Sequence, residues 1–151
     1  MSDALANAAI GRLIDAAKNA AKNAYAPYSA FHVGAALQLD TGHIVTAANF
    51  ENASYGLSLC AETVAIAKAA SDGQLSNITA IAIAGGPAKI DMSADLGHDP
   101  VTPCGRCRQI IKEVADLTET DIPIHCAHKK GYVTYRLSEL LPHAFGPANL
   151  E

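Results

Sequence analysis

Three cysteines and one glutamate have the types and spacing of a metal-dependent active site. Cys104 and Cys107 lie three residues apart, and Glu62 follows Cys60 after one intervening residue. Two cysteines at this spacing in a tight turn can bind one metal ion, and Cys60 can supply a third sulfur. Zinc prefers four tetrahedral ligands, and a catalytic zinc keeps one position for water. Glu62 would then lie close enough to that water to move protons without being a ligand.

Two other interpretations of these cysteines stay open at this point. A single C-x-x-C pair also occurs in redox proteins and in structural zinc sites. A structural zinc usually recruits a fourth Cys or His, and Cys126 is available for that role. Cys126 falls in a predicted strand, however, where we expect it to pack as a small apolar side chain. None of the six histidines lies within a few residues of either motif, and we interpret all six as surface or core residues.

Both cysteine motifs stand at the starts of predicted helices, over residues 60–71 and about 105–117. The partial positive charge at a helix N-terminus favours thiolate over thiol, which suits a metal ligand. Residues 85–103 contain glycines and prolines without periodicity, and they predict a long loop that leads into the second motif. The remaining pattern predicts a helix over 3–24 capped by Asp3, strands over 31–39, 44–50, 78–84, 122–126 and 132–135, and a helical turn over 137–141.

This alternation predicts an α/β protein in which helices cover a central sheet. We find no repeat, linker or low-complexity tract, so we expect a single domain over residues 1–151. The chain is 50% hydrophobic and 17% charged, which excludes intrinsic disorder. Its net charge of −4 argues against binding a polynucleotide or a strand-editing activity, but permits a pocket for one nucleoside.

No apolar stretch is long enough to span a membrane, and the first residues lack the pattern of a secretory signal. We therefore expect a cytoplasmic protein, in which cysteines are thiols or metal ligands before they are disulfides.

Five segments of the chain resemble, in the same order, those of small homotetrameric cytidine deaminases. They are residues 28–37, 49–55, 60–62, 103–109 and 139–147. The resemblance implies a three-layer α/β/α fold with a central mixed five-stranded sheet. It also implies zinc held by Cys60, Cys104 and Cys107, with Glu62 as the catalytic proton carrier. The expected reaction is hydrolytic deamination of cytidine and 2′-deoxycytidine to the uridine products and ammonia, in pyrimidine salvage.

The same resemblance implies the substrate contacts. Asn49 and Glu51 would bind a ribose hydroxyl, and their spacing near a strand end places both side chains on one face. The carbonyl of Thr102 would accept from the amine, the amide of Ala61 would bind the ring oxygen, and Phe31 would line the base pocket.

Further contacts are expected from a neighbouring subunit. The family resemblance implies that Phe145, Ala53 and Tyr55 reach the site of an adjacent copy, so the active sites of a homotetramer would be shared. We expect no nucleic-acid partner and no membrane.

The sequence departs from the family in the residue that offsets the charge of the site. Three thiolates and one zinc ion carry a net charge of about −1. Many relatives have arginine directly after the glutamate, but this chain has Thr63. Arg106, between two cysteines, is the candidate replacement for charge compensation. Blasticidin S deaminase has the same arginine, so inactivation of a cytosine nucleoside antibiotic is the alternative function; Asn49, Glu51 and the Phe31 segment oppose it.

Two further hypotheses follow from the sequence. Residues 85–102 form a longer loop than is usual for the family, and we expect it to shape the pocket entrance and extend substrate choice to base-modified cytidines. A zinc-stabilised interaction module without catalysis is the alternative from another class, and Glu62 argues against it, because a structural site has no use for a proton carrier.

Overall fold

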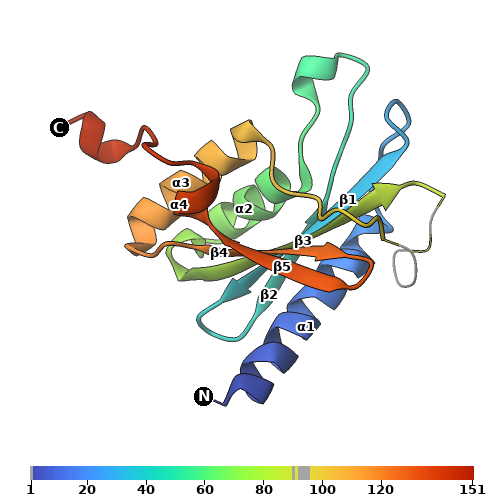
Figure 1. Ribbon diagram of the computed structural model, residues 1–151. Coiled ribbons are helices and arrows are strands. Elements are labelled where there is room, and N and C mark those ends of the chain that lie inside the picture. Colours follow the sequence, from blue (N-terminus) through green and yellow to red (C-terminus); the bar gives the residue numbers. More distant parts are fainter. Residues whose placement is uncertain (1, 90, 92–95) are drawn as a thin grey trace.

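A mixed sheet of five strands forms the centre of the molecule (Figure 1). The computed structural model describes residues 2–89, 91 and 96–151. The strand order is β2-β1-β3-β4-β5; β3 and β4 run parallel, and the other neighbours are antiparallel. This confirms the predicted sheet. The strands are β1 (Phe31–Leu39), β2 (Ile44–Ala48), β3 (Ile78–Pro87), β4 (Pro123–His128) and β5 (Gly131–Arg136).

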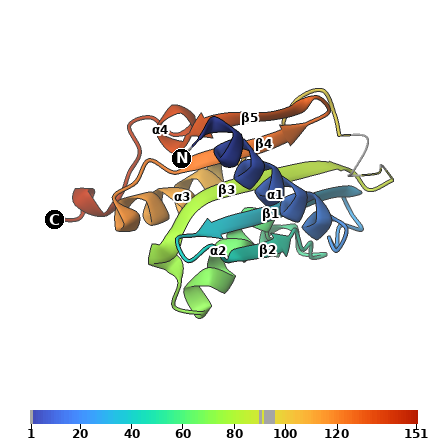
Figure 2. The same ribbon diagram turned by 90° about the horizontal axis from the view of Figure 1, so that it is seen from below.

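Helices cover both faces of the sheet, which confirms the three-layer α/β/α architecture. Helix α1 (Asp3–Ala21) crosses β1 and β3 on one face (Figure 2). Helices α2 (Ala61–Ser71) and α3 (Gly105–Thr118) pack on the other face. A short helix, α4 (Leu137–Leu140), follows β5, and three single-turn 3₁₀ helices lie at Tyr55–Leu57, Leu75–Asn77 and Pro147–Asn149.

The two faces of the sheet differ in side-chain size because strand residues alternate. In β3, Ile81 and Ile83 pack toward α2 and α3, whereas Ala82 and Ala84 pack toward α1. The alanine face allows α1 to lie very close to β1. At the closest point is Gly34, where an added Cβ would lie 1.9 Å from the carbonyl oxygen of Ala17.

The first helix ends earlier and begins differently than predicted. It ends at Ala21 rather than at residue 24, because Tyr25 forms an extended bridge with Phe50 and must leave the helix first. Its N-cap is Ser2, so Asp3 is the first helical residue and places its negative charge in the first turn. Strand β2 likewise ends at Ala48 rather than residue 50.

The predicted loop over residues 85–103 is shorter than expected at its start. Residues 85–87 continue β3 and pair with the first residues of β1, so that Val33 lies opposite Gly85. Residues 90 and 92–95 lie outside the described residues. Beyond them Leu96 is 4% exposed and packs in the core beneath α1, while the carbonyl of Gly97 accepts from the amide of Lys129 at 2.9 Å.

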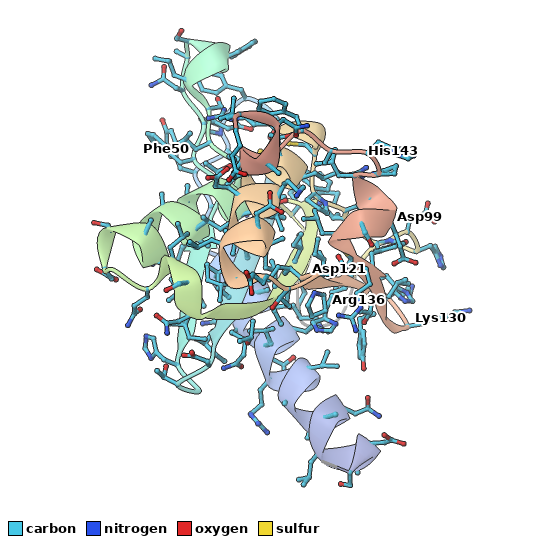
Figure 3. All side chains as sticks on the ribbon, turned by 90° about the vertical axis from the view of Figure 1, so that its left-hand side faces the viewer. Phe50, Asp99, Asp121, Lys130, Arg136 and His143 are labelled. Atoms are coloured by element: carbon cyan, nitrogen blue, oxygen red, sulfur yellow. The ribbon has the colours of Figure 1, made fainter. Side chains whose placement is uncertain are left out.

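Polar contacts fasten the last helix to the sheet. Asp121 precedes β4, and its carboxylate accepts from the amide of Ser138 at 3.0 Å and from the hydroxyl of Ser138 at 2.6 Å. Arg136 donates from Nη1 to the carbonyl oxygen of Asp121 at 3.1 Å (Figure 3).

Within the described part of the chain, no helix combines the length and hydropathy needed to cross a bilayer.

Candidate active site and metal centre

The metal centre forms where the N-termini of α2 and α3 meet. Cys60 is the N-cap of α2, Cys104 is the N-cap of α3, and Cys107 is the third residue of α3. The three sulfurs all lie within 4.8 Å of one another. Two sulfurs bound to one tetrahedral zinc at 2.3 Å would stand about 3.8 Å apart. The Cys60 and Cys104 sulfurs are separated by 3.8 Å, so the cluster fits zinc.

The cysteine thiols of the cluster differ in pKa. Hydrogen bonding from Cys107 lowers the pKa of Cys60, with smaller help from Cys104 and from the charge of Arg106. The same pairing, together with burial, raises the pKa of Cys107. Cys60 therefore loses its proton first, and a bound cation would complete deprotonation of the set.

Cys126 does not belong to the cluster. Its side chain is fully buried in the core between the sheet and α2 and α3, and burial raises its pKa to about 12. The expectation that it packs as a small apolar residue is confirmed. His125, its neighbour in β4, is also buried and pairs through Nδ1 with the hydroxyl of Thr134 at 2.8 Å.

Glu62 is the second residue of α2 and is 4% exposed. Burial, with a smaller contribution from the charge of Cys60, raises the pKa of Glu62 to about 7. A carboxyl group with this pKa is present in both protonation states at neutral pH. That property suits a group that must accept a proton and then release it.

A cavity of about 270 Å³ joins Glu62 to the cluster and to the end of β2. This volume suits a small molecule. The cavity brings together many of the residues singled out from the sequence. Its lining residues are Val33, Asn49, Glu51, Ser58, Leu59, Cys60, Ala61, Glu62, Val101, Thr102 and Cys104.

Asn49 and Glu51 lie just beyond the end of β2. The side chains of both form hydrogen bonds with the backbone at the start of β1 or just before it. The side-chain oxygen Oδ1 of Asn49 accepts from the backbone amide of Val33 at 2.9 Å, and its Nδ2 donates to the backbone carbonyl of Phe31 at 3.0 Å. The carboxylate of Glu51 accepts from the amide and hydroxyl of Ser29 and from the amide of Tyr28. The Ser29 hydroxyl in particular lowers the pKa of Glu51, so an acceptor carboxylate faces the cavity.

Phe31, which was expected to line the base pocket, does not line this cavity, and neither do the three residues expected to serve a neighbouring copy. Phe31 stands exposed at the start of β1, Ala53 is exposed, and Phe145 is 59% exposed near the C-terminus. Tyr55 is 73% exposed and lines a second cavity of about 270 Å³, which shares Glu51 and Ser58 with the first.

Arg106 lies near the cluster but outside the cavity lining. Its Nη1 donates to the carbonyl of Ser58 at 3.4 Å, and its charge is one of the influences that favour thiolate at Cys60. The long loop reaches the cavity only through Val101 and Thr102 among its described residues.

Sequence reasoning gave no positioning role to Arg108 and Gln109, although both lie in the second cysteine segment. The guanidinium of Arg108 donates to the carbonyl of Pro103 at 2.8 Å and to that of Leu140 at 2.9 Å, so it ties the metal-binding turn to α4. Gln109 donates to the carbonyl of Phe145 at 3.0 Å. Their place one turn into a helix that begins at a cysteine was the available signal.

Comparison with known proteins agrees with this geometry. Residues 9–119 match the family model of the cytidine and deoxycytidylate deaminase zinc-binding region. A cytidine deaminase of Halalkalibacterium halodurans is 42% identical over 134 residues, which cover 88% of this chain and 91% of that protein. A cytidine deaminase of Mycobacterium tuberculosis is 40% identical over 132 residues, 86% of this chain and 84% of that protein.

Solved structures give the same result. The crystal structure of cytidine deaminase from Burkholderia pseudomallei superposes with a TM-score of 0.76 at 37% identity, covering 89% of this chain and 98% of that one.

A blasticidin-S deaminase of Bacillus cereus matches over only 84 residues, 56% of this chain and 58% of that protein, at 36% identity. The chain belongs to the cytidine and deoxycytidylate deaminase family.

Proposed function

We propose that this protein is a zinc-dependent hydrolase that converts cytidine and 2′-deoxycytidine to the uridine products and ammonia. One observation carries the proposal: the buried carboxyl group of Glu62 lines the same cavity as Cys60 and Cys104. A structural metal site needs no such proton carrier. The partial match to blasticidin-S deaminase makes that antibiotic the natural competitor in the assay.

The residues of the chain divide the reaction between them. Bound zinc would supply an activated water as the nucleophile. Glu62 takes a proton from that water and passes it to the ring nitrogen. The hydroxyl that remains adds to the ring carbon that carries the amine. Glu62 then takes the proton of that added hydroxyl and gives it to the amine, and the carbon–nitrogen bond breaks to release ammonia and leave the ring carbonyl. Ala61 and Thr102 line the cavity beside Glu62. We expect the backbone amide of Ala61 to hold the ring oxygen and the backbone carbonyl of Thr102 to accept from the amine.

Charge in the two cavities supports a nucleoside over a nucleotide. The charged side chains that line them are the carboxyl groups of Glu51 and Glu62, and no lysine or arginine lines either cavity among the described residues. A sugar hydroxyl can donate to the carboxylate of Glu51. A phosphate on the sugar would instead meet the like charge of Glu51, with no lysine or arginine among the described lining residues to compensate it.

We infer that the active protein is a homotetramer in which Phe145, Ala53 and Tyr55 complete the site of a neighbouring copy. The support is the exposure of six large aromatic side chains that do not line the first cavity, among which Tyr25 stands with Phe50 at a ring-centroid distance of 6.0 Å and Tyr28 with Tyr55 at 5.6 Å. Exposed apolar surface of this kind marks an interaction site. Those aromatic side chains are Tyr25, Tyr28, Phe31, Phe50, Tyr55 and Phe145.

Subunit sharing has a direct test. Mixing a Phe145→Ala variant with a Glu62→Gln variant should restore activity, because a mixed oligomer contains sites with both intact residues. Each protein alone should be impaired. Failure of the mixture to regain activity, with exchange of subunits verified, would contradict shared sites.

We further propose that Arg106 offsets the negative charge of the cluster, that the protein acts in the cytoplasm, and that it serves pyrimidine salvage. None of the four cysteines forms a disulfide, which suits a reducing compartment. The extension of substrate choice by the loop over residues 85–102 is a separate prediction. Its support is the place of Val101 and Thr102 in the cavity wall, and shortening the loop should change the ratio of turnover on base-modified cytidine to that on cytidine.

The proposed function is tested by a spectrophotometric assay on purified protein with cytidine, 2′-deoxycytidine, cytosine and blasticidin S, alongside zinc analysis. We expect cytidine to be deaminated with about one zinc per chain. Glu62→Gln should keep the zinc and lose about 10²- to 10⁴-fold in turnover, the range for a general acid–base group. Exposed Glu113 on α3 provides the matched control, Glu113→Gln, which should remain active. Zinc without turnover on cytidine would overturn the substrate assignment.

A further inference from the structure

We propose that the hydroxyl of Thr63 donates a hydrogen bond to the sulfur of Cys107 and thereby stabilises the negative charge of the metal centre. Thr63 is then a positioning residue that acts on the metal through its ligand. The inference rests on the proposed zinc site and adds a member to it.

Thr63 reaches the cluster because it and Cys107 occupy equivalent positions in the first turns of α2 and α3. Thr63 is the third residue of α2, and Cys107 is the third residue of α3. Because each helix begins at a metal-ligand cysteine, their first turns face one another. The Oγ1 atom of Thr63 lies 3.5 Å from the Sγ atom of Cys107.

The direction of this hydrogen bond follows from chemistry. A thiolate that binds a metal has no proton and can only accept. The threonine hydroxyl has a proton and can donate. A hydrogen bond to a charged partner is also stronger than one between neutral groups.

The need for a donor is greatest at Cys107. Cys104 is exposed and Cys60 is half-buried, so water can solvate them, whereas Cys107 is fully buried. A buried charge is costly unless it is fully compensated, and the two positive charges of one zinc ion are shared among three thiolates. The carboxyl group of Glu62 cannot serve as a lasting donor, because it must give up its proton during the reaction and then, as a carboxylate, acts on Cys107 with charge of the same sign.

Thr63 and Arg106 therefore serve different sulfurs. The influence of Arg106 falls on Cys60, beside which its guanidinium reaches the carbonyl of Ser58. Among the described residues, Thr63 supplies the one hydroxyl within hydrogen-bonding distance of a cluster sulfur. The residue directly after the catalytic glutamate thus acts on the cluster by donating a hydrogen bond to a ligand, without carrying a charge of its own.

The test compares Thr63→Val, which keeps the shape and removes the hydroxyl, with Thr63→Ser, which keeps the hydroxyl. The matched control is Thr118→Val at the far end of α3, where a half-buried threonine hydroxyl donates to the carbonyl of Val114 at 2.9 Å. Each full-length protein is loaded with cobalt(II) for spectroscopy and with zinc for competition against a chromogenic chelator. Thr63→Ala serves as the second variant without a hydroxyl should the valine variant not fold.

We expect loss of the hydroxyl at Thr63 to move the sulfur-to-cobalt charge-transfer band to lower energy and to weaken zinc retention about ten-fold, the lower end for outer-shell partners. Thr63→Ser and Thr118→Val should match the wild type in both measurements. A wild-type spectrum and wild-type zinc retention in Thr63→Val would overturn the inference while leaving the zinc site intact. A wild-type chain with no thiolate band on cobalt loading would overturn the metal site itself.

Discussion

Replacing Gly34 with alanine should force helix α1 away from strand β1. An alanine Cβ at this position would lie 1.9 Å from the carbonyl oxygen of Ala17 and 2.5 Å from the amide nitrogen of Ala21. Real Cβ contacts do not fall below 3.0 Å, so the first separation must grow by at least 1.1 Å, the difference between 3.0 and 1.9 Å. Both neighbours are backbone atoms in a fully buried part of the helix, so no side chain can rotate away to relieve the contact.

The size of the effect can be worked out from this geometry. Overpacking costs about 1–3 kcal/mol, and a backbone collision belongs at the upper end, about 3 kcal/mol. The unfolding entropy of about 2.1 cal/mol/K per residue gives about 0.32 kcal/mol/K for this chain of 151 residues. The midpoint of thermal unfolding, Tm, should therefore fall by about 9 °C.

The assay is thermal unfolding by circular dichroism at fixed protein and zinc concentrations, because metal binding and assembly both shift Tm. Gly11 offers the matched control in the same helix, since a Cβ there would meet no atom within 4 Å. Gly11→Ala should raise Tm by about 2–3 °C, because alanine in a helix is favoured over glycine by about 0.5–1 kcal/mol. A Gly34→Ala variant that unfolds within about 2 °C of the wild type would refute the close contact between α1 and β1.

Three further predictions concern the site and the core. Arg106→Ala should lower turnover more than zinc content, because Arg106 acts by its charge on the ligand Cys60 and is not itself a ligand. Turnover is measured beside zinc analysis, and a variant with the turnover of the wild type would count against charge compensation. Cys126→Ala should keep about one zinc per chain and lose about 1–3 kcal/mol of stability, measured by denaturant unfolding; loss of the metal would make Cys126 a ligand. Burial lowers the pKa of His125 below its unfolded value, so the unfolded state takes up the proton first and the free energy of unfolding falls as pH drops below about 6.5. His125→Asn should reduce that dependence on pH in denaturant titrations between about pH 5 and 7, and an unchanged slope would refute this assignment.

The parts of the site that depend on neighbouring residues could be predicted from the sequence. Cys104 and Cys107 lie within one turn, so their spacing alone brings the two sulfurs together. Cys60 and Glu62 likewise share the first turn of a helix whose pattern is visible in the sequence. The continuous apolar run at β3 showed that this strand is covered on both faces, as its isoleucines and alanines confirm.

The contacts that the sequence did not reveal join residues far apart in the chain. No periodicity links Glu51 to Ser29, 22 positions earlier, although their hydrogen bond shapes one wall of the cavity. Leu96 lies in a segment without pattern, and only the assembled core beneath α1 gives it a place. Gly34 looks like an ordinary strand glycine until α1 is packed upon it. The end of α1 at Ala21 was missed for the same reason, because it depends on the bridge between Tyr25 and Phe50.

The separation of the cysteines between two helix starts gives the metal a mechanical role as well as a chemical one. Cys60 and Cys104 are 44 residues apart in the chain, yet their sulfurs are 3.8 Å apart. An ion bound to both closes a loop that contains α2, β3 and the whole connection to α3. A covalent cross-link around a loop of this size would remove chain entropy worth about 4 kcal/mol from the unfolded state. The ion that serves catalysis therefore also holds the start of α2 to the start of α3. A chelator that removes it should lower the free energy of unfolding as well as the activity.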